Sequence, residues 1–134
     1  MEKSRRKLAR EKATIGVYQN LLVDSSLEDI ITYLNEDKAL RDNAKSMDFS
    51  QWLVSTTLKN KASYQNLIEK HLKKNWTFER LSVMERAILL IATCELLESD
   101  LDKKVVINEA VMNAKVFCDD ESYKFINGIL SQVI

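Results

Sequence analysis

The absence of proline limits the fold of this chain more than any other feature. The chain has 134 residues, no proline and only two glycines, Gly16 and Gly128. Proline and glycine form most tight turns and interrupt most strands, and a β-rich chain of this length needs many such positions. We therefore expect an all-α fold. The length also suffices for one domain with a true core, burying roughly 65–70% of its unfolded surface, and we assign residues 1–134 to a single domain.

Apolar residues recur at helical spacing along most of the chain, which predicts about seven helices. The clearest helical segments are residues 4–23, 26–35, 48–74, 105–117 and 120–133. The segment 48–74 fits either one helix or two, because serine and threonine at positions 55–57 lower the helix propensity of its middle. Residues 36–46 are polar and are predicted to form the longest loop.

Ser82 and Glu85 have the spacing of a capping box, and an apolar run follows them at once. A helix that is apolar on most of its faces is expected at the centre of a domain. Gly128 lies inside a helical pattern, where glycine lowers stability relative to alanine. We expect Gly128 to mark a close approach between two helices.

The charges are unevenly distributed along the chain. The formal net charge is zero, with twenty basic and twenty acidic residues. Six of the first twelve residues are cationic and two are glutamates, so this segment carries +4 and the remainder carries −4. Such polarity could present a basic end to phosphate while the acidic remainder meets a basic partner.

The basic start allows two interpretations. Cations are unfavourable at a helix N-terminus, so the segment is either a solvated helix end or a surface for an external anion. Arg5, Arg6 and Arg10 can make forked contacts with phosphates. Tyr18 could stack on a base, although core packing is the simpler explanation of this residue.

The sequence shows no arrangement of residues typical of an enzyme or a metal site. The two cysteines, Cys94 and Cys118, are far apart, and His71 is the only histidine. There is no glycine-rich phosphate loop and no nucleophile with a plausible base. The longest apolar run is far shorter than a membrane span. We expect a cytoplasmic, non-catalytic protein without a metal or cofactor.

Four segments, in order, resemble the NusB family of transcription antitermination factors. They are the arginine-rich start followed by VYQ at 17–19, ERLSVMERAILLIATCELL at 79–97, VVINEAV at 105–111 and ESYKFINGIL at 121–130. Each segment alone is a weak signal, but the combination is specific. The resemblance covers the N-terminal fifth and most of the C-terminal half, whereas residues 22–75 add little to it.

The resemblance implies both a fold and a function. The fold would be all-helical, with two small helical subdomains. The function would be RNA binding in antitermination: together with the ribosomal protein NusE, such a factor binds boxA-type single-stranded RNA. The complex then helps RNA polymerase to read through terminators, notably in ribosomal RNA operons.

The resemblance also implies roles for individual residues. The positions that match RNA-contacting residues of the family are Arg5, Arg6, Lys7, Arg10, Tyr18, Lys124 and Phe125. The positions that match the protein-partner surface are Glu79, Glu85 and Glu121. Glu121 stands where the family usually has aspartate, so its role transfers less directly.

Several positions depart from the family pattern. Leu90 replaces a common arginine, Cys94 a tyrosine, Asp102 a proline and Cys118 a helix-ending glycine. The loss of that glycine is expected to lower stability.

Two other functions remain open at this stage: a helical protein-interaction scaffold that has lost RNA binding, and a fragment of a ribosomal RNA methyltransferase. The sequence also leaves open whether the free protein forms a homodimer.

Overall fold

The chain folds into helices, as a computed structural model shows for the backbone of residues 2–133 and the side chains of residues 5–133. Eight α-helices and one 3₁₀-helix, and no strand, occur within this part of the chain. Their bounds are α1 Glu2–Val23, α2 Leu27–Asn35, α3 Lys38–Arg41, α4 Ala44–Lys59, α5 Lys61–Glu69, η1 Phe78–Arg80, α6 Val83–Glu98, α7 Lys103–Phe117 and α8 Asp120–Val133. The all-α prediction is confirmed.

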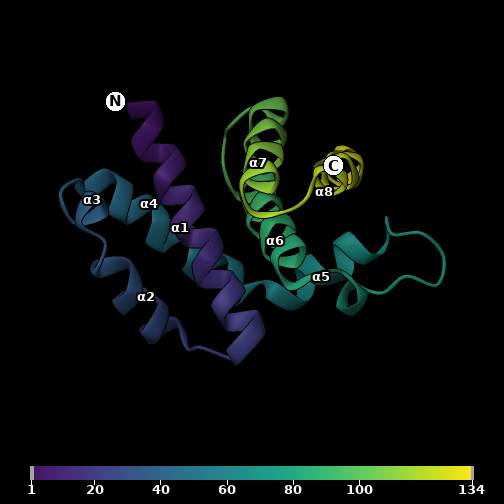
Figure 1. Cartoon of the computed structure of the whole chain (residues 1–134), viewed down its shortest axis with the longest axis horizontal. Coiled ribbons are helices and arrows are strands. Elements are labelled where there is room, and N and C mark those ends of the chain that lie inside the picture. Colours follow the sequence, from purple (N-terminus) through teal and green to yellow (C-terminus); the bar gives the residue numbers. More distant parts are fainter. Residues whose placement is uncertain (1, 134) are drawn as a thin grey trace.

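The helices form two groups that meet at α6. Helices α1–α4 pack on one another, and α5, α7 and α8 pack around α6, which also contacts α1 and α4 (Figure 1). Every residue from Ala87 to Leu96 is buried, which explains the apolar run. The predicted capping box begins this helix: Ser82 Oγ accepts the Glu85 N–H at 3.1 Å, and the Glu85 carboxylate accepts the Ser82 N–H at 3.0 Å.

The predicted loop at residues 36–46 contains an extra helical turn, α3. Asp37 caps it by accepting the Leu40 N–H at 3.0 Å, and Asn43 caps α4 by accepting the Ser46 N–H at 2.9 Å. A single turn has no readable apolar period, so the pattern predicted about seven helices rather than eight. The segment 48–74 is two helices, but they separate at Asn60 and not at positions 55–57.

The close approach predicted at Gly128 occurs instead at Gly16. A Cβ added to Gly16 would lie 2.5 Å from Ile30 Cγ2, which shows how closely α1 and α2 pack. A Cβ added to Gly128 would meet nothing within 4 Å, because this residue lies on an exposed face of α8. The prediction for Gly128 was therefore wrong.

The departures from the family pattern fit the fold. Leu90 and Cys94 are fully buried in the core. Asp102 caps α7 by accepting the Lys104 N–H at 2.8 Å. Cys118 ends α7 in an extended conformation with φ −127°, where glycine has no conformational advantage. The expected loss of stability at this position stays a prediction. Across residues 2–133, no helix is both long and apolar enough to cross a membrane.

Candidate nucleic-acid interface

The basic start of α1 is held against α4. Arg5 and Arg6 are exposed and Lys7 is half-buried. The Arg6 guanidinium carbon lies 3.7 Å from the centre of the Phe49 ring, a cation–π distance that limits the freedom of this side chain. Phe49 is itself buried and stacks on Trp52, with 6.3 Å between the ring centres. The start of α1 therefore presents cations that the fold partly orders.

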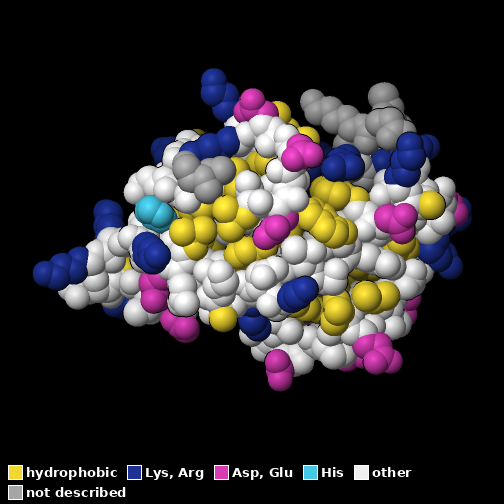
Figure 2. Space-filling view, turned by 180° about the vertical axis from the view of Figure 1, so that it is seen from behind, with side chains coloured by type: hydrophobic (Ala, Val, Ile, Leu, Met, Phe, Trp, Pro, Cys, Tyr) yellow, Lys and Arg dark blue, Asp and Glu magenta, His cyan; other side chains and the backbone are white. Residues whose placement is uncertain are grey.

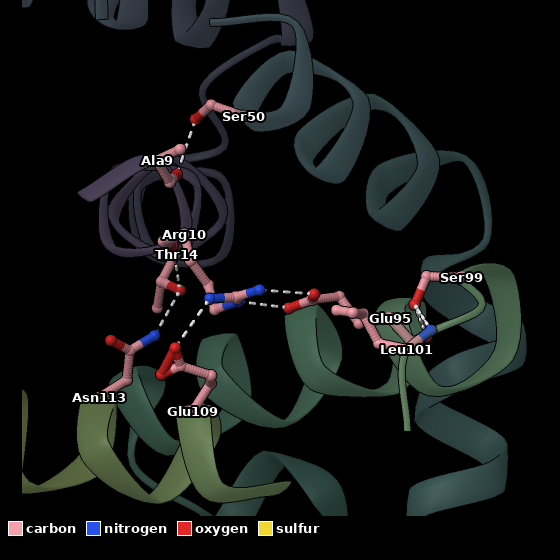
Figure 3. A network of polar contacts seen from close by, with 9 residues as sticks. All are labelled: Ala9, Arg10, Thr14, Ser50, Glu95, Ser99, Leu101, Glu109 and Asn113. Atoms are coloured by element: carbon pink, nitrogen blue, oxygen red, sulfur yellow. Dashed lines mark hydrogen bonds and ion pairs between the residues drawn. The ribbon is translucent and has the colours of Figure 1, made fainter. Parts of the chain in front are cut away.

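Arg10 does not belong to this exposed basic surface. It is only 4% exposed, and its guanidinium donates two hydrogen bonds to the Glu95 carboxylate, at 2.6 and 2.9 Å. A third contact, at 3.3 Å, joins it to Glu109 (Figure 3). A buried guanidinium that two carboxylates already occupy cannot reach an RNA phosphate. The predicted phosphate contact of Arg10 is therefore wrong.

The Arg10 cluster ties three helices together. Arg10 comes from α1, Glu95 from α6 and Glu109 from α7, and Asn113 adds a 3.4 Å contact to Thr14 Oγ1 (Figure 3). The sequence carried a signal for this position: Arg10 lies three and seven residues before Ala13 and Val17, both fully buried, and so shares their helix face.

Tyr18 lies apart from the cations at the start of α1. Thirteen residues separate it from Arg5, which corresponds to about 20 Å along a helix. Its side chain is half-buried and packs against the core. Base stacking by Tyr18 stays a prediction.

A groove of about 750 Å³ brings together four of the predicted residues. Lys124, Phe125 and Glu121 reach it from α8, and Glu85 reaches it from the first turn of α6. Phe125 is half-buried, whereas Lys124 and Glu121 are exposed. Residues predicted for RNA and residues predicted for a protein partner thus line the same groove. Glu79 is exposed on η1 but does not line it.

Two of the carboxylates in the groove form hydrogen bonds within the protein. Glu85 caps α6 and also accepts the Ser122 hydroxyl at 2.8 Å. Asp119 accepts the Ser122 N–H at 3.2 Å. These two groups connect α6 to the start of α8, so their charges are partly satisfied within the protein. Glu121 is exposed, so its carboxylate is available to a partner.

The far wall of the groove consists of residues that the sequence-based reasoning missed. His71, Lys73, Trp76 and Arg80 line it from the segment between α5 and α6. Trp76 is 46% exposed, and the Arg80 guanidinium carbon lies 5.0 Å from its ring centre. A signal was available: residues 70–80 contain four cations around a tryptophan. Cations interleaved with an aromatic residue are typical of single-stranded nucleic-acid sites.

One face of the molecule carries an apolar area with cations at its edges. Figure 2 shows hydrophobic side chains across the middle of this face, beside the histidine at the left. Lys and Arg side chains gather at both ends of this apolar band, including the end over the start of α1.

The thiols do not suggest a reactive or metal-binding site. Burial raises the pKa of Cys94 to about 11, and burial also raises the pKa of Cys118. Both thiols are therefore neutral near pH 7 and poor nucleophiles. Among the residues that the structure describes, no cluster of three or more His, Cys, Asp or Glu side chains could hold a metal ion.

Residues 7–134 match the sequence profile of the NusB family. The chain belongs to the NusB family. It is 41% identical over 130 residues to the transcription antitermination protein NusB of Staphylococcus haemolyticus, a match that covers 96% of this chain and 98% of the relative. The NusB protein of Staphylococcus aureus is 39% identical over 130 residues, covering 96% of this chain and 97% of that relative.

Solved NusB structures share the fold. The NusB structure of T. maritima superposes with a TM-score of 0.82 and 32% identity, covering 96% of this chain and 89% of that one. A crystal structure of NusB and NusE in complex with double-stranded RNA gives a TM-score of 0.81 at 25% identity, covering 97% and 96% of the two chains. The NusB-like arrangement inferred from four sequence segments is thus confirmed along nearly the whole chain.

Proposed function

We propose that this chain is an RNA-binding transcription antitermination factor that binds RNA through the exposed basic start of α1 and the groove with Lys124 and Phe125. The observation that carries the proposal is the groove itself, in which Lys124 and Phe125 meet the cations Lys73 and Arg80 from a distant part of the chain. Arg5, Arg6 and Lys7 supply positive charge, which attracts RNA phosphates without reading sequence. Phe125 offers a ring on which an unstacked base can pack. Arg10 has a structural role in this proposal.

The proposed partners are boxA-type RNA and the ribosomal protein NusE, within the antitermination complex of RNA polymerase. The NusB relative solved with NusE and RNA supports this assembly. The RNA in that structure is double-stranded, whereas the RNA proposed for this chain is single-stranded. Relatives that carry the name transcription antitermination protein support the antitermination function. The proposal includes read-through in ribosomal RNA operons. The whole chain would act as one RNA-binding unit, without catalysis.

Removing two cations from the start of α1 should change the salt dependence of RNA binding. We expect Arg5→Gln/Arg6→Gln to flatten the slope of log affinity against log salt by about 1.4, since each lost phosphate contact contributes about 0.7 on single-stranded RNA. Glutamine keeps the apolar stem of Arg6 over Phe49, so folding should be retained. The measurement is a titration of labelled boxA-type RNA at four or more salt concentrations.

Lys59→Gln is the matched control for this titration. Lys59 is exposed and lies near the C-terminal end of α1, far along that helix from Arg5. The hydrogen bond that the neighbouring Lys61 donates to Asn20, at 2.9 Å, shows this position. Loss of Lys59 should leave the slope unchanged. If the double arginine variant also leaves the slope unchanged, the basic start is only a solvated helix end. The protein-interaction scaffold would then be the better description.

Charge reversal on the acidic side should weaken docking of the basic ribosomal protein. We expect Glu79→Lys/Glu121→Lys to weaken NusE binding by about 1–3 kcal/mol, because like charges then face one another across the interface. Charge reversal at Glu85 would also remove the cap of α6. Glu85→Gln keeps a hydrogen-bond acceptor for the Ser82 N–H and therefore tests the effect of the charge alone. Calorimetric titration of the folded variants with NusE measures the effect, and an unaltered affinity would move the interface elsewhere.

A further inference from the structure

Gly128 has no structural explanation within the fold. It lies in the middle of α8, where glycine destabilises a helix relative to alanine. A Cβ at this position would meet nothing within 4 Å, so neither crowding nor helix contact requires glycine. Gly128 does line the groove, together with Trp76 and Phe125. The missing side chain therefore leaves space in the groove wall.

Trp76 is exposed but is not loosely held. Its backbone N–H donates to the Lys73 carbonyl at 3.0 Å, and the preceding residue, Asn75, adopts a left-handed conformation with φ 74°. Arg80 donates from Nη1 to the Asn75 carbonyl at 3.2 Å and also lies over the indole ring. Glu69 closes the segment by accepting the Phe78 N–H at 2.7 Å. The fold therefore fixes a large aromatic side chain at the surface, next to the groove.

The cations that line the groove with Trp76 can pair with a polyanion. Lys73 and Arg80 lie on the same wall as Trp76, and Lys124 lies on α8. Three carboxylates also line the groove: Glu85 and Asp119 accept hydrogen bonds from Ser122 and are partly compensated, whereas Glu121 is exposed. An aromatic ring among cations suits an unstacked base and its flanking phosphates.

We propose that the groove receives an unpaired RNA base that stacks on Trp76, in the space that Gly128 leaves open. Lys73 and Arg80 contact the adjacent phosphates. The inference rests on the proposed function, because it adds a base contact to the proposed RNA-binding groove with Lys124 and Phe125. It makes the segment between α5 and α6 a recognition element for single-stranded RNA.

The first test is removal of the stacking surface. Trp76→Ala should lower affinity for labelled single-stranded boxA-type RNA by about 5- to 150-fold, whereas Trp76→Phe should keep most of it. The salt slope should stay unaltered, because stacking releases few counterions. A fully paired RNA of the same sequence should bind both proteins equally. In a Trp52→Phe background, Trp76 is the only tryptophan, and its fluorescence should be quenched by the single-stranded RNA.

The second test fills the space instead of removing a contact. Gly128→Leu should lower single-stranded RNA affinity to a similar degree, while its melting temperature stays the same or rises, because leucine favours the helix. A structural role alone would not combine higher stability with weaker binding. Val116→Leu, at another exposed position on α7, is the matched control and should leave RNA binding unchanged.

The outcomes separate this inference from the proposed function. If Trp76→Ala and Gly128→Leu bind single-stranded RNA like the parent while Arg5→Gln/Arg6→Gln flattens the salt slope, the groove does not hold a base and the proposed function stands. If all three variants bind unaltered, both proposals fail. If Trp76→Ala weakens NusE binding and not RNA binding, the groove holds a protein side chain and the inference is overturned.

Discussion

Replacing Arg10 with alanine is expected to destabilise the fold by about 3–5 kcal/mol. The variant leaves the Glu95 carboxylate, only 1% exposed, without its bidentate partner in the core. Glu109 loses its contact with α1 as well. Because the charge that remains is buried and cannot be hydrated, the penalty exceeds that of an ordinary lost hydrogen bond. Urea unfolding followed by circular dichroism measures the difference.

Two further variants identify the cause of this loss. Arg5→Ala, at an exposed position on the same helix, should change stability by less than about 0.5 kcal/mol. Arg10→Met/Glu95→Met removes both charges and should be more stable than Arg10→Ala, since no buried charge remains. If Arg10→Ala unfolds at the same urea concentration as the parent, the cluster is not a structural tie. A phosphate contact by Arg10 would then need a new test.

Gly16→Ala is expected to destabilise the protein by roughly 1–2 kcal/mol, the balance of two opposing effects. Its Cβ would lie 2.5 Å from Ile30 Cγ2, and Ile30 is fully buried and cannot move away freely. Overpacking of this kind costs about 1–3 kcal/mol, and the better helix propensity of alanine offsets up to about 1 kcal/mol. Thermal and urea unfolding of the single variant measure the net effect.

A second substitution, at Ile30, tests whether the contact with Ile30 causes the expected loss of stability in Gly16→Ala. Ile30→Ala removes the crowded methyl group, so adding Gly16→Ala to that background should be neutral or stabilising. Gly128→Ala should stabilise the protein by about 0.5–1 kcal/mol, because its Cβ enters open space. Equal destabilisation by Gly16→Ala in both backgrounds would show that the contact between α1 and α2 is not the cause.

The local features of the fold could be predicted from nearby residues. Ser82 and Glu85 predicted the start of α6 because a capping box is complete within four residues. The apolar run after it predicted a central helix because burial on every face requires apolar residues on every face. The one-turn α3 was missed because it is shorter than one apolar repeat.

The candidate site could be predicted only in part. Lys124, Phe125 and Glu121 lie within five residues of one motif, and they do line one groove. The other wall comes from residues 71–80, about fifty positions earlier in the chain. The family resemblance identified no binding residues in that segment, so Trp76 and Arg80 were not among the predicted residues.

Short-range sequence signals were enough to establish that the chain is helical, where most helices begin and end, and which family it resembles. These properties depend on turn-forming residues, helix caps and apolar periodicity, all of which act over a few residues. Helix packing, in contrast, settles which polar groups are available to a ligand. It turns Arg10 into the core beside Glu95 while Arg6 stays exposed, although both belong to one basic run. It also brings Trp76 to α8, because burial and proximity depend on how helices pack across long sequence separations.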